Sequence, residues 1–118
     1  MKNLKLLMLL FVFLIVSCNK MEFNKVDWLK KDDLSSYIYR DKMIKDLIEN
    51  HKLVGLSHEE ISELLGNPEN YSDTDPNTIY YNIVTDYAND IDPVYIKNLR
   101  IKFNTFDKVE SFNIEETK

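Results

Sequence analysis

The spacing of apolar residues changes once along this chain, from the period of an α-helix to the period of a β-strand. Between residues 40 and 52, the apolar residues Met43, Ile44, Leu47 and Ile48 fall on one face of a helix. In the C-terminal part, apolar and polar residues alternate instead, as they do in a strand with one buried face. Helices that precede strands in this way predict an α+β layer, in which the helices cover one face of an antiparallel sheet.

A second helix is predicted over residues 58–65, because its start and its end both carry the expected signals. Ser57 and Glu60 fit a capping box, in which each side chain bonds the backbone N–H of the other residue. Gly66 follows the last apolar residue and suits a helix C-cap, and Pro68 prevents the helix from continuing.

Three strands are predicted after this helix, over residues 78–84, 99–103 and 109–114. The short connection 105–108 makes the second and third strands an antiparallel hairpin. Apolar residues in the third strand do not alternate cleanly, so this strand can hold a β-bulge. The predicted fold is therefore two helices packed on a three-stranded antiparallel sheet, in the order ααβββ.

The first 18 residues have the layout of an export signal. Lys2 and Lys5 form a positive start, and residues 6–16 form an unbroken apolar run. This run is shorter than the roughly 20 residues that span a bilayer, and it has the length of a secretory h-region. The four residues that follow Leu14, ending at Cys18, read Ile-Val-Ser-Cys and resemble the lipobox of bacterial lipoproteins. The resemblance implies that Cys18 is lipidated and that the chain is cut before it.

An ordinary secreted protein with an incidental or buried Cys18 thiol is the alternative. Cys18 is the only cysteine, so no intramolecular disulfide can form. A free thiol is a liability in an oxidising compartment, and acylation consumes it. Two or more acyl chains anchor a protein stably, which favours a membrane-bound lipoprotein.

These signals divide the chain into a signal peptide (1–17), a lipidated tether (18–36) and an α+β domain (37–118). Removing residues 1–17 takes away two lysines and leaves 13 basic and 20 acidic residues, a net charge of −7. Such a chain is repelled by phosphate backbones, which argues against a nucleic-acid partner. Trp28 in the tether could contact a partner or the bilayer interface, but we favour a tether that folds back onto the domain.

Residue patterns that would indicate catalysis or metal binding are weak. His51 and His58 have no cysteine or acidic pair at metal-ligand spacing, and no serine lies in a nucleophile motif. Asp73 and Asp75 resemble the start of a calcium loop, but Thr78 replaces the required glycine. Asp86, Asp90 and Asp92 could hold a weak cation, although turn formation explains them. We therefore expect no enzyme activity, no metal, no cofactor and no small-molecule substrate.

A set of short motifs in residues 40–115 resembles the small outer-membrane lipoproteins of the SmpA/OmlA type, the BamE-like group. The motifs are Arg40-x-x-Met43, Gly55-Leu56-Ser57, Glu60-Ile61, Leu64-Leu65-Gly66-Asn67-Pro68, Tyr81-x-Ile83 and Leu99-x-Ile101-x-Phe103. The resemblance implies an accessory subunit that binds the machine inserting β-barrel proteins into the outer membrane. The residues after Cys18 lack an aspartate at the second position, which by lipoprotein sorting rules implies an outer-membrane protein facing the periplasm. Exposure on the cell surface is left open.

Two functions follow as hypotheses. In the first, the protein is a binding module that docks on an envelope protein complex through the open sheet face or the sheet edges. In the second, it is a lipid-anchored inhibitor or ligand-binding lipoprotein. Alternation along the strands places Tyr80, Arg100 and Lys102 on the outer face, and tyrosine with arginine is typical of interaction patches. A merely solvated face is the alternative.

Overall fold

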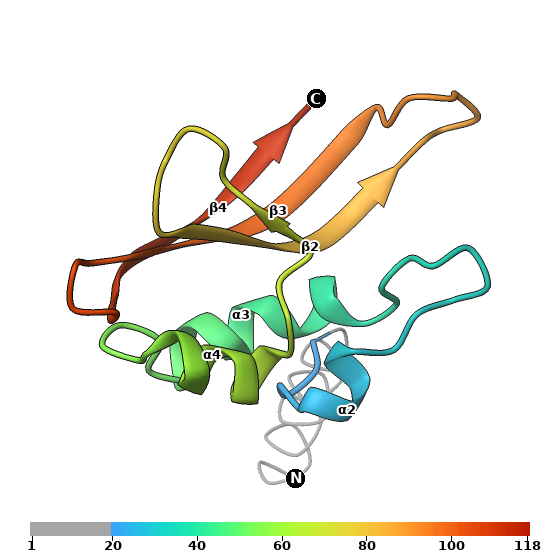
Figure 1. Cartoon of the computed structure of the whole chain (residues 1–118). Helices are drawn as coiled ribbons and strands as arrows, with labels where there is room; N and C mark the ends of the chain where they lie inside the picture. The colour runs from blue at the N-terminus through green and yellow to red at the C-terminus, as the bar shows by residue number, and fades with distance from the viewer. Residues whose placement is uncertain (1–19) are drawn as a thin grey trace, which may run out of the picture.

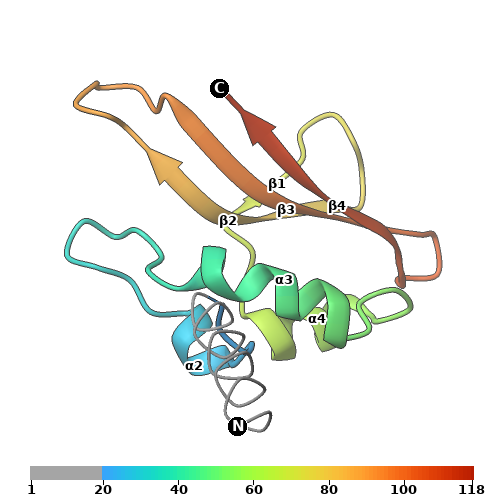
Figure 2. The ribbon, with the colours of Figure 1, turned by 180° about the vertical axis from the view of Figure 1, so that it is seen from behind.

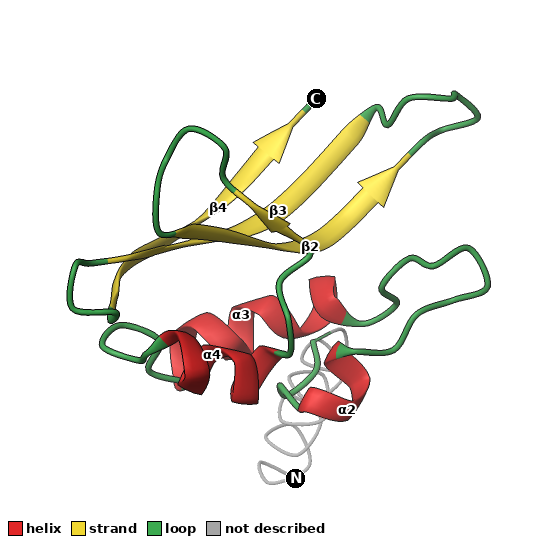
Figure 3. Cartoon of the chain, viewed as in Figure 1, coloured by secondary structure: helices red, strands yellow, loops and turns green. Residues whose placement is uncertain are grey.

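The computed structural model describes residues 20–118 of the 118-residue chain as a layer of helices packed under one antiparallel sheet. Figure 1 and Figure 2 show the helices on one side of the sheet in both views, and Figure 3 separates the two layers by colour. Among residues 20–118, no helix combines the length and the apolar character needed to cross a membrane. The elements are α2 (Lys25–Trp28), α3 (Arg40–Asn50), α4 (His58–Leu65), β1 (Asn70–Tyr71), β2 (Thr78–Asp86), β3 (Tyr95–Phe103) and β4 (Val109–Thr117).

The predicted α+β class with an antiparallel sheet is confirmed, and the element count needs two corrections. The sheet has four strands in the order β1-β2-β3-β4, because the two-residue β1 pairs with β2. The helical layer gains α2, a single turn whose Asn24 side chain accepts a bond of 2.9 Å from the Asp27 N–H. Both additions are too short to show a period in the sequence.

Helix α4 has the bounds and the cap that its sequence predicts. The Glu60 N–H donates to the Ser57 hydroxyl at 3.2 Å, and the Ser57 N–H donates to the Glu60 carboxylate at 3.1 Å. Helix α3 ends at Asn50, two residues before the predicted limit of 52. Pro68 follows α4 and lies half-buried in the link to β1.

Gly66 ends α4 in a backbone conformation that requires glycine. Its φ is 81° and its ψ is −169°, so it has the expected positive φ but an extended ψ instead of a left-handed helical one. A Cβ atom at this position would lie 3.0 Å from Cδ2 of Leu29. The Gly66 carbonyl also accepts a bond of 2.7 Å from the Tyr81 hydroxyl. The glycine thus lets the chain pass close to Leu29 as it leaves α4.

Replacing Gly66 with valine should lower the free energy of unfolding by at least about 1 kcal/mol. Two costs add, because a β-branched residue resists this φ and its Cβ meets Leu29. Gly55 offers a matched control, since its φ is 92° but nothing lies within 4 Å of an added Cβ. Urea unfolding should show a larger loss for Gly66→Val than for Gly55→Val. Equal losses would mean that the contact with Leu29 contributes nothing.

Two β-bulges adjust the strands to the helical layer. The register of β3 against β4 shifts between Lys102 and Phe103, which leaves Glu110 as an extra residue in β4. The bulge lets Val109 and Phe112 both face the helices, and it confirms the irregularity predicted for this strand. A second shift, between Asn82 and Val84 in β2, was not predicted.

The core lies between the helices and the inner face of the sheet. Its buried members include the predicted strand residues Ile79, Tyr81, Ile83, Leu99, Ile101 and Phe103 and the predicted helix residues Met43, Ile44, Leu47, Ile61 and Leu65. Trp28 belongs to the same core, and Met21 and Phe23 pack against it. The folded unit therefore begins well before residue 37, the boundary predicted from the sequence. Cys18 and the predicted signal peptide (1–17) lie outside the described residues.

Candidate functional site

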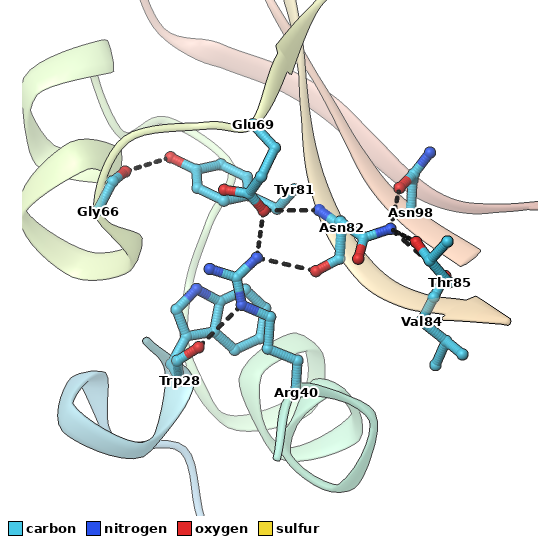
Figure 4. A network of polar contacts seen from close by, with 9 residues as sticks. All are labelled: Trp28, Arg40, Gly66, Glu69, Tyr81, Asn82, Val84, Thr85 and Asn98. Atoms are coloured by element: carbon cyan, nitrogen blue, oxygen red, sulfur yellow. Dashed lines mark hydrogen bonds and ion pairs between the residues drawn. The ribbon is translucent and has the colours of Figure 1, made fainter. Parts of the chain in front are cut away.

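A buried arginine connects three parts of the chain at one end of the core. Arg40, the first residue of α3, is fully buried, and its Nε donates to the Trp28 carbonyl at 2.9 Å. Its Nη1 donates to the Asn82 carbonyl at 2.8 Å and forms an ion pair with Glu69. Glu69 accepts a further bond of 2.9 Å from the Asn82 N–H. Figure 4 shows this network joining α2, the link after α4 and the bulged strand β2.

Aromatic rings enclose the guanidinium group of Arg40. Its Cζ lies 4.5 Å from the ring centre of Trp28 and 3.3 Å from that of Tyr37, so cation–π contacts add to the ion pair. Nearby, burial and the charge of Glu69 raise the pKa of Tyr81, whose hydroxyl donates to Gly66. The Tyr81 phenol thus stays protonated and acts as a hydrogen-bond donor. The cluster joins α2, the start of α3, the link after α4 and strand β2.

Residues 21–39, which we call the N-terminal strap, are held against α3 by hydrogen bonds that backbone N–H groups of the strap donate. The Met21 N–H donates to the Lys42 carbonyl at 3.0 Å, and the Phe23 N–H donates to the Asp46 carboxylate at 2.7 Å. The latter bond holds the pKa of Asp46 below its usual value. Trp28 is 0% exposed, so the candidate role as a partner-binding residue is wrong. The favoured alternative, a tether folded onto the domain, describes the strap.

The outer face of the sheet carries the other three residues that the sequence proposes for partner binding. Tyr80 and Arg100 are cross-strand neighbours on β2 and β3, and both are half-buried. Arg100 forms an ion pair with Asp75 of the β1–β2 loop, which Figure 1 shows rising from the sheet on the side away from the helices. Lys102 lies 3.9 Å from Glu110 and is 41% exposed. The chain's own loop therefore already engages part of this face.

A shallow pocket of about 460 Å³ lies on this face between the β1–β2 loop and the sheet. Its lining combines two tyrosines with amide, hydroxyl and carboxylate groups and consists of Asn70, Tyr71, Ser72, Asp73, Thr74, Tyr80, Asn98 and Glu115. Such a lining offers hydrogen bonds and an aromatic surface to a polar ligand.

The acidic loops and the histidines form no metal centre within residues 20–118, where no group of three or more metal-binding side chains comes together. Asp75 is occupied by Arg100. Asp86 accepts from the Ala88 N–H at 3.0 Å, and Asp90 accepts from the Ile91 N–H at 2.8 Å, so these carboxylates shape a turn. His58 stacks on Phe103 and bonds Asp107, whereas His51 lies near Asp46 at the end of α3.

Several exposed apolar side chains on loops were missed by the sequence analysis. Leu34, Ile91 and Phe106 are 86%, 93% and 82% exposed. Each lies in a connection between elements, where the sequence shows no period that would assign a side chain to the inside or the outside. Only their exposure in the folded chain marks them as surface available to a partner.

No protein-family model, curated protein or solved structure matches this chain. The resemblance to the BamE-like group stays a prediction.

Proposed function

We propose that this protein is a lipid-anchored, protein-binding accessory module of the cell envelope. The observation that carries the proposal is the one-sided sheet. Among residues 20–118, the helices cover its inner face and leave part of the outer face and most of the β4 edge uncovered. Exposed Leu34, Ile91 and Phe106 add apolar surface on three separate loops. The lipobox ending at Cys18 would supply the anchor, and the net charge of −7 keeps the domain from lying on anionic lipid.

The finer proposal is that the partner belongs to the machine that inserts β-barrel proteins into the outer membrane, with this protein facing the periplasm. It rests on the BamE-like motifs and on the residues that follow Cys18. A ligand-binding lipoprotein is the second candidate, because the pocket beside Tyr71 and Tyr80 offers polar groups to a small ligand. A lipid-anchored inhibitor of a soluble enzyme would use the same outer face.

Affinity capture of the full-length lipidated protein from detergent-solubilised membranes tests these functions. A β-barrel insertase in the captured fraction supports the accessory role, and a single soluble hydrolase supports the inhibitor. The double variant Tyr80→Ala, Arg100→Ala should fold and capture less partner, whereas Glu63→Ala on an exposed part of α4 should capture the same amount. Capture of no envelope protein by the folded, anchored chain would contradict the proposal.

Cys18→Ala should release the protein from the membrane fraction or leave it as an unprocessed precursor, because the thiol that accepts the lipid is gone. Folding should not change, since the described core begins after this residue. Palmitate labelling and membrane flotation of the two proteins measure the effect. A Cys18→Ala variant that still incorporates palmitate and floats with membranes would show that the lipobox assignment is wrong.

A further inference from the structure

We propose that the free edge of β4 binds an extended, basic strand of the partner protein, which then becomes a fifth strand of the sheet. The inference rests on the proposed function and names the site and the chemistry of the partner. Within residues 20–118, β4 ends the strand order and pairs only with β3. Beyond its first residue, this nine-residue strand has an edge whose outward backbone groups pair with no strand in residues 20–118, and such an edge is a template for another strand.

The backbone directions identify which residues of β4 offer these groups. The Phe103 N–H donates to the Asn77 carbonyl at 2.8 Å, so Phe103 directs its backbone groups toward β2. Because directions alternate along a strand, Ile101, Leu99 and Lys97 do the same. Their cross-strand partners on β4, which are Phe112, Ile114 and Glu116, therefore direct their N–H and C=O groups away from β3, toward the free edge.

The chain itself already uses the start of this edge as a strand-pairing surface. The Val109 N–H donates to the Leu56 carbonyl at 2.8 Å, and the Val109 carbonyl accepts from the Gly55 N–H at 2.9 Å. Ser57 and Lys108 form an isolated antiparallel bridge at the same place. The edge geometry thus accepts an extended segment at Val109, and after the bulge at Glu110 the outward-facing positions resume at Phe112.

Beside this edge, on the helix side, lies an apolar groove of about 350 Å³. Ile48, Leu53, Val54 and Phe112 contribute its apolar lining, and Glu49, Asn50, His51 and Lys52 complete it. Phe112 and Ile114 are half-buried and face this side. A strand added to β4 would place alternate side chains over the groove, so we expect these residues of the partner to be apolar.

The charge of β4 favours a basic strand as the occupant of its edge. Strand β4 contains Glu110, Glu115 and Glu116 and no lysine or arginine. Two β4 strands paired antiparallel about Asn113 would set Glu116 against Glu110 twice, whereas pairing about Ile114 would set Phe112 against Glu116 and oppose no two glutamates. A parallel pair would align every glutamate with its copy. Lysine or arginine on an added strand would face these glutamates with the opposite charge, so we assign the edge to a basic segment of another protein, and a second copy is an outcome of the test.

A peptide of about seven residues in which lysine and valine alternate is a suitable probe. Binding to the full-length protein in detergent micelles should slow amide hydrogen exchange at Phe112, Ile114 and Glu116 by about tenfold or more. Asn113 and Glu115, whose N–H groups already face β3, should not change. A glutamate–valine peptide, and a lysine–valine peptide N-methylated on the residues that face the edge, should bind at least about tenfold more weakly.

A matched pair of variants separates backbone pairing from side-chain packing. Ile114→Pro removes an outward N–H without removing a bond to β3, and Pro is tolerated on edge strands. Ile114→Val keeps the N–H and most of the side chain. The peptide should lose about tenfold in affinity for the proline variant and little for the valine variant.

Four outcomes overturn the inference. They are equal binding of the glutamate–valine peptide, protection centred on Tyr80 and Arg100, absence of binding, and dimers of the free protein that protect the same three amides. The last would assign the edge to a second copy. Capture of an envelope protein while the edge amides stay unprotected would also overturn the edge inference, but it would leave the proposed function standing. Edge binding without envelope capture would contradict only the proposed function.

Discussion

Ile101→Asp is expected to prevent this domain from folding. Ile101 is 0% exposed near the C-terminal end of β3, between its cross-strand neighbours Ile79 and Phe112. The change removes a buried apolar side chain and places an unpaired carboxylate in the core. The combined cost exceeds about 4 kcal/mol, against a total stability of about 5–15 kcal/mol for a domain of ordinary size. Far-ultraviolet circular dichroism and a thermal melt measure it.

Lys102→Ala is the matched control for this prediction, because Lys102 is the next residue on the strand and points to the outer face. Its ammonium lies 3.9 Å from Glu110, and both side chains are exposed, so removing it should change stability by less than about 1 kcal/mol. A native melt for Ile101→Asp together with an unfolded Lys102→Ala would mean that the side chains of β3 point the other way. The assignment of residues to the outer face, and the assignment of β4 residues to the free edge, would then both be wrong.

Arg40→Ala should lower the free energy of unfolding by about 3–5 kcal/mol, the cost of breaking a buried ion pair from one side. The Trp28 and Asn82 carbonyls lose their donor, and the Glu69 carboxylate loses its cation. Two aromatic rings also lose the guanidinium that they enclose. Urea unfolding gives the free energy. Emission of Trp28, the only tryptophan of the chain, reports whether the N-terminal strap loosens.

Variants at the ion pair distinguish the effect of losing the positive charge from the effect of losing the planar guanidinium group. Arg40→Lys keeps the charge but not the planar fork that reaches both carbonyls, so it should lie between wild type and Arg40→Ala. Arg40→Met with Glu69→Gln removes both charges and keeps an acceptor for the Asn82 N–H. It should recover part of the loss of Arg40→Met alone. If the double variant is no more stable than Arg40→Met alone, water solvates the Glu69 carboxylate well enough that losing Arg40 as its ion-pair partner costs no stability.

The local signals of the sequence determined the elements that depend on neighbours along the chain. Helix α4 has its predicted bounds because Ser57, Glu60 and Gly66 act within a few residues of one another. The strands place Leu99 and Ile101 inside because side chains alternate along any strand, whatever covers it. The α+β class followed from the same two periods, and the irregular third strand was recognisable as a place for a bulge.

Tertiary structure alone decided the contacts that join distant positions. Arg40 reads as a helix-start residue in the sequence, but its ion-pair partner Glu69 lies 29 positions away, on the far side of α4. Trp28 enters the core only because the strap returns along α3, and Arg100 is neutralised only because the β1–β2 loop brings Asp75 above the sheet. Charges and isolated aromatic residues have no period, so their burial depends on which surface the completed fold brings against them.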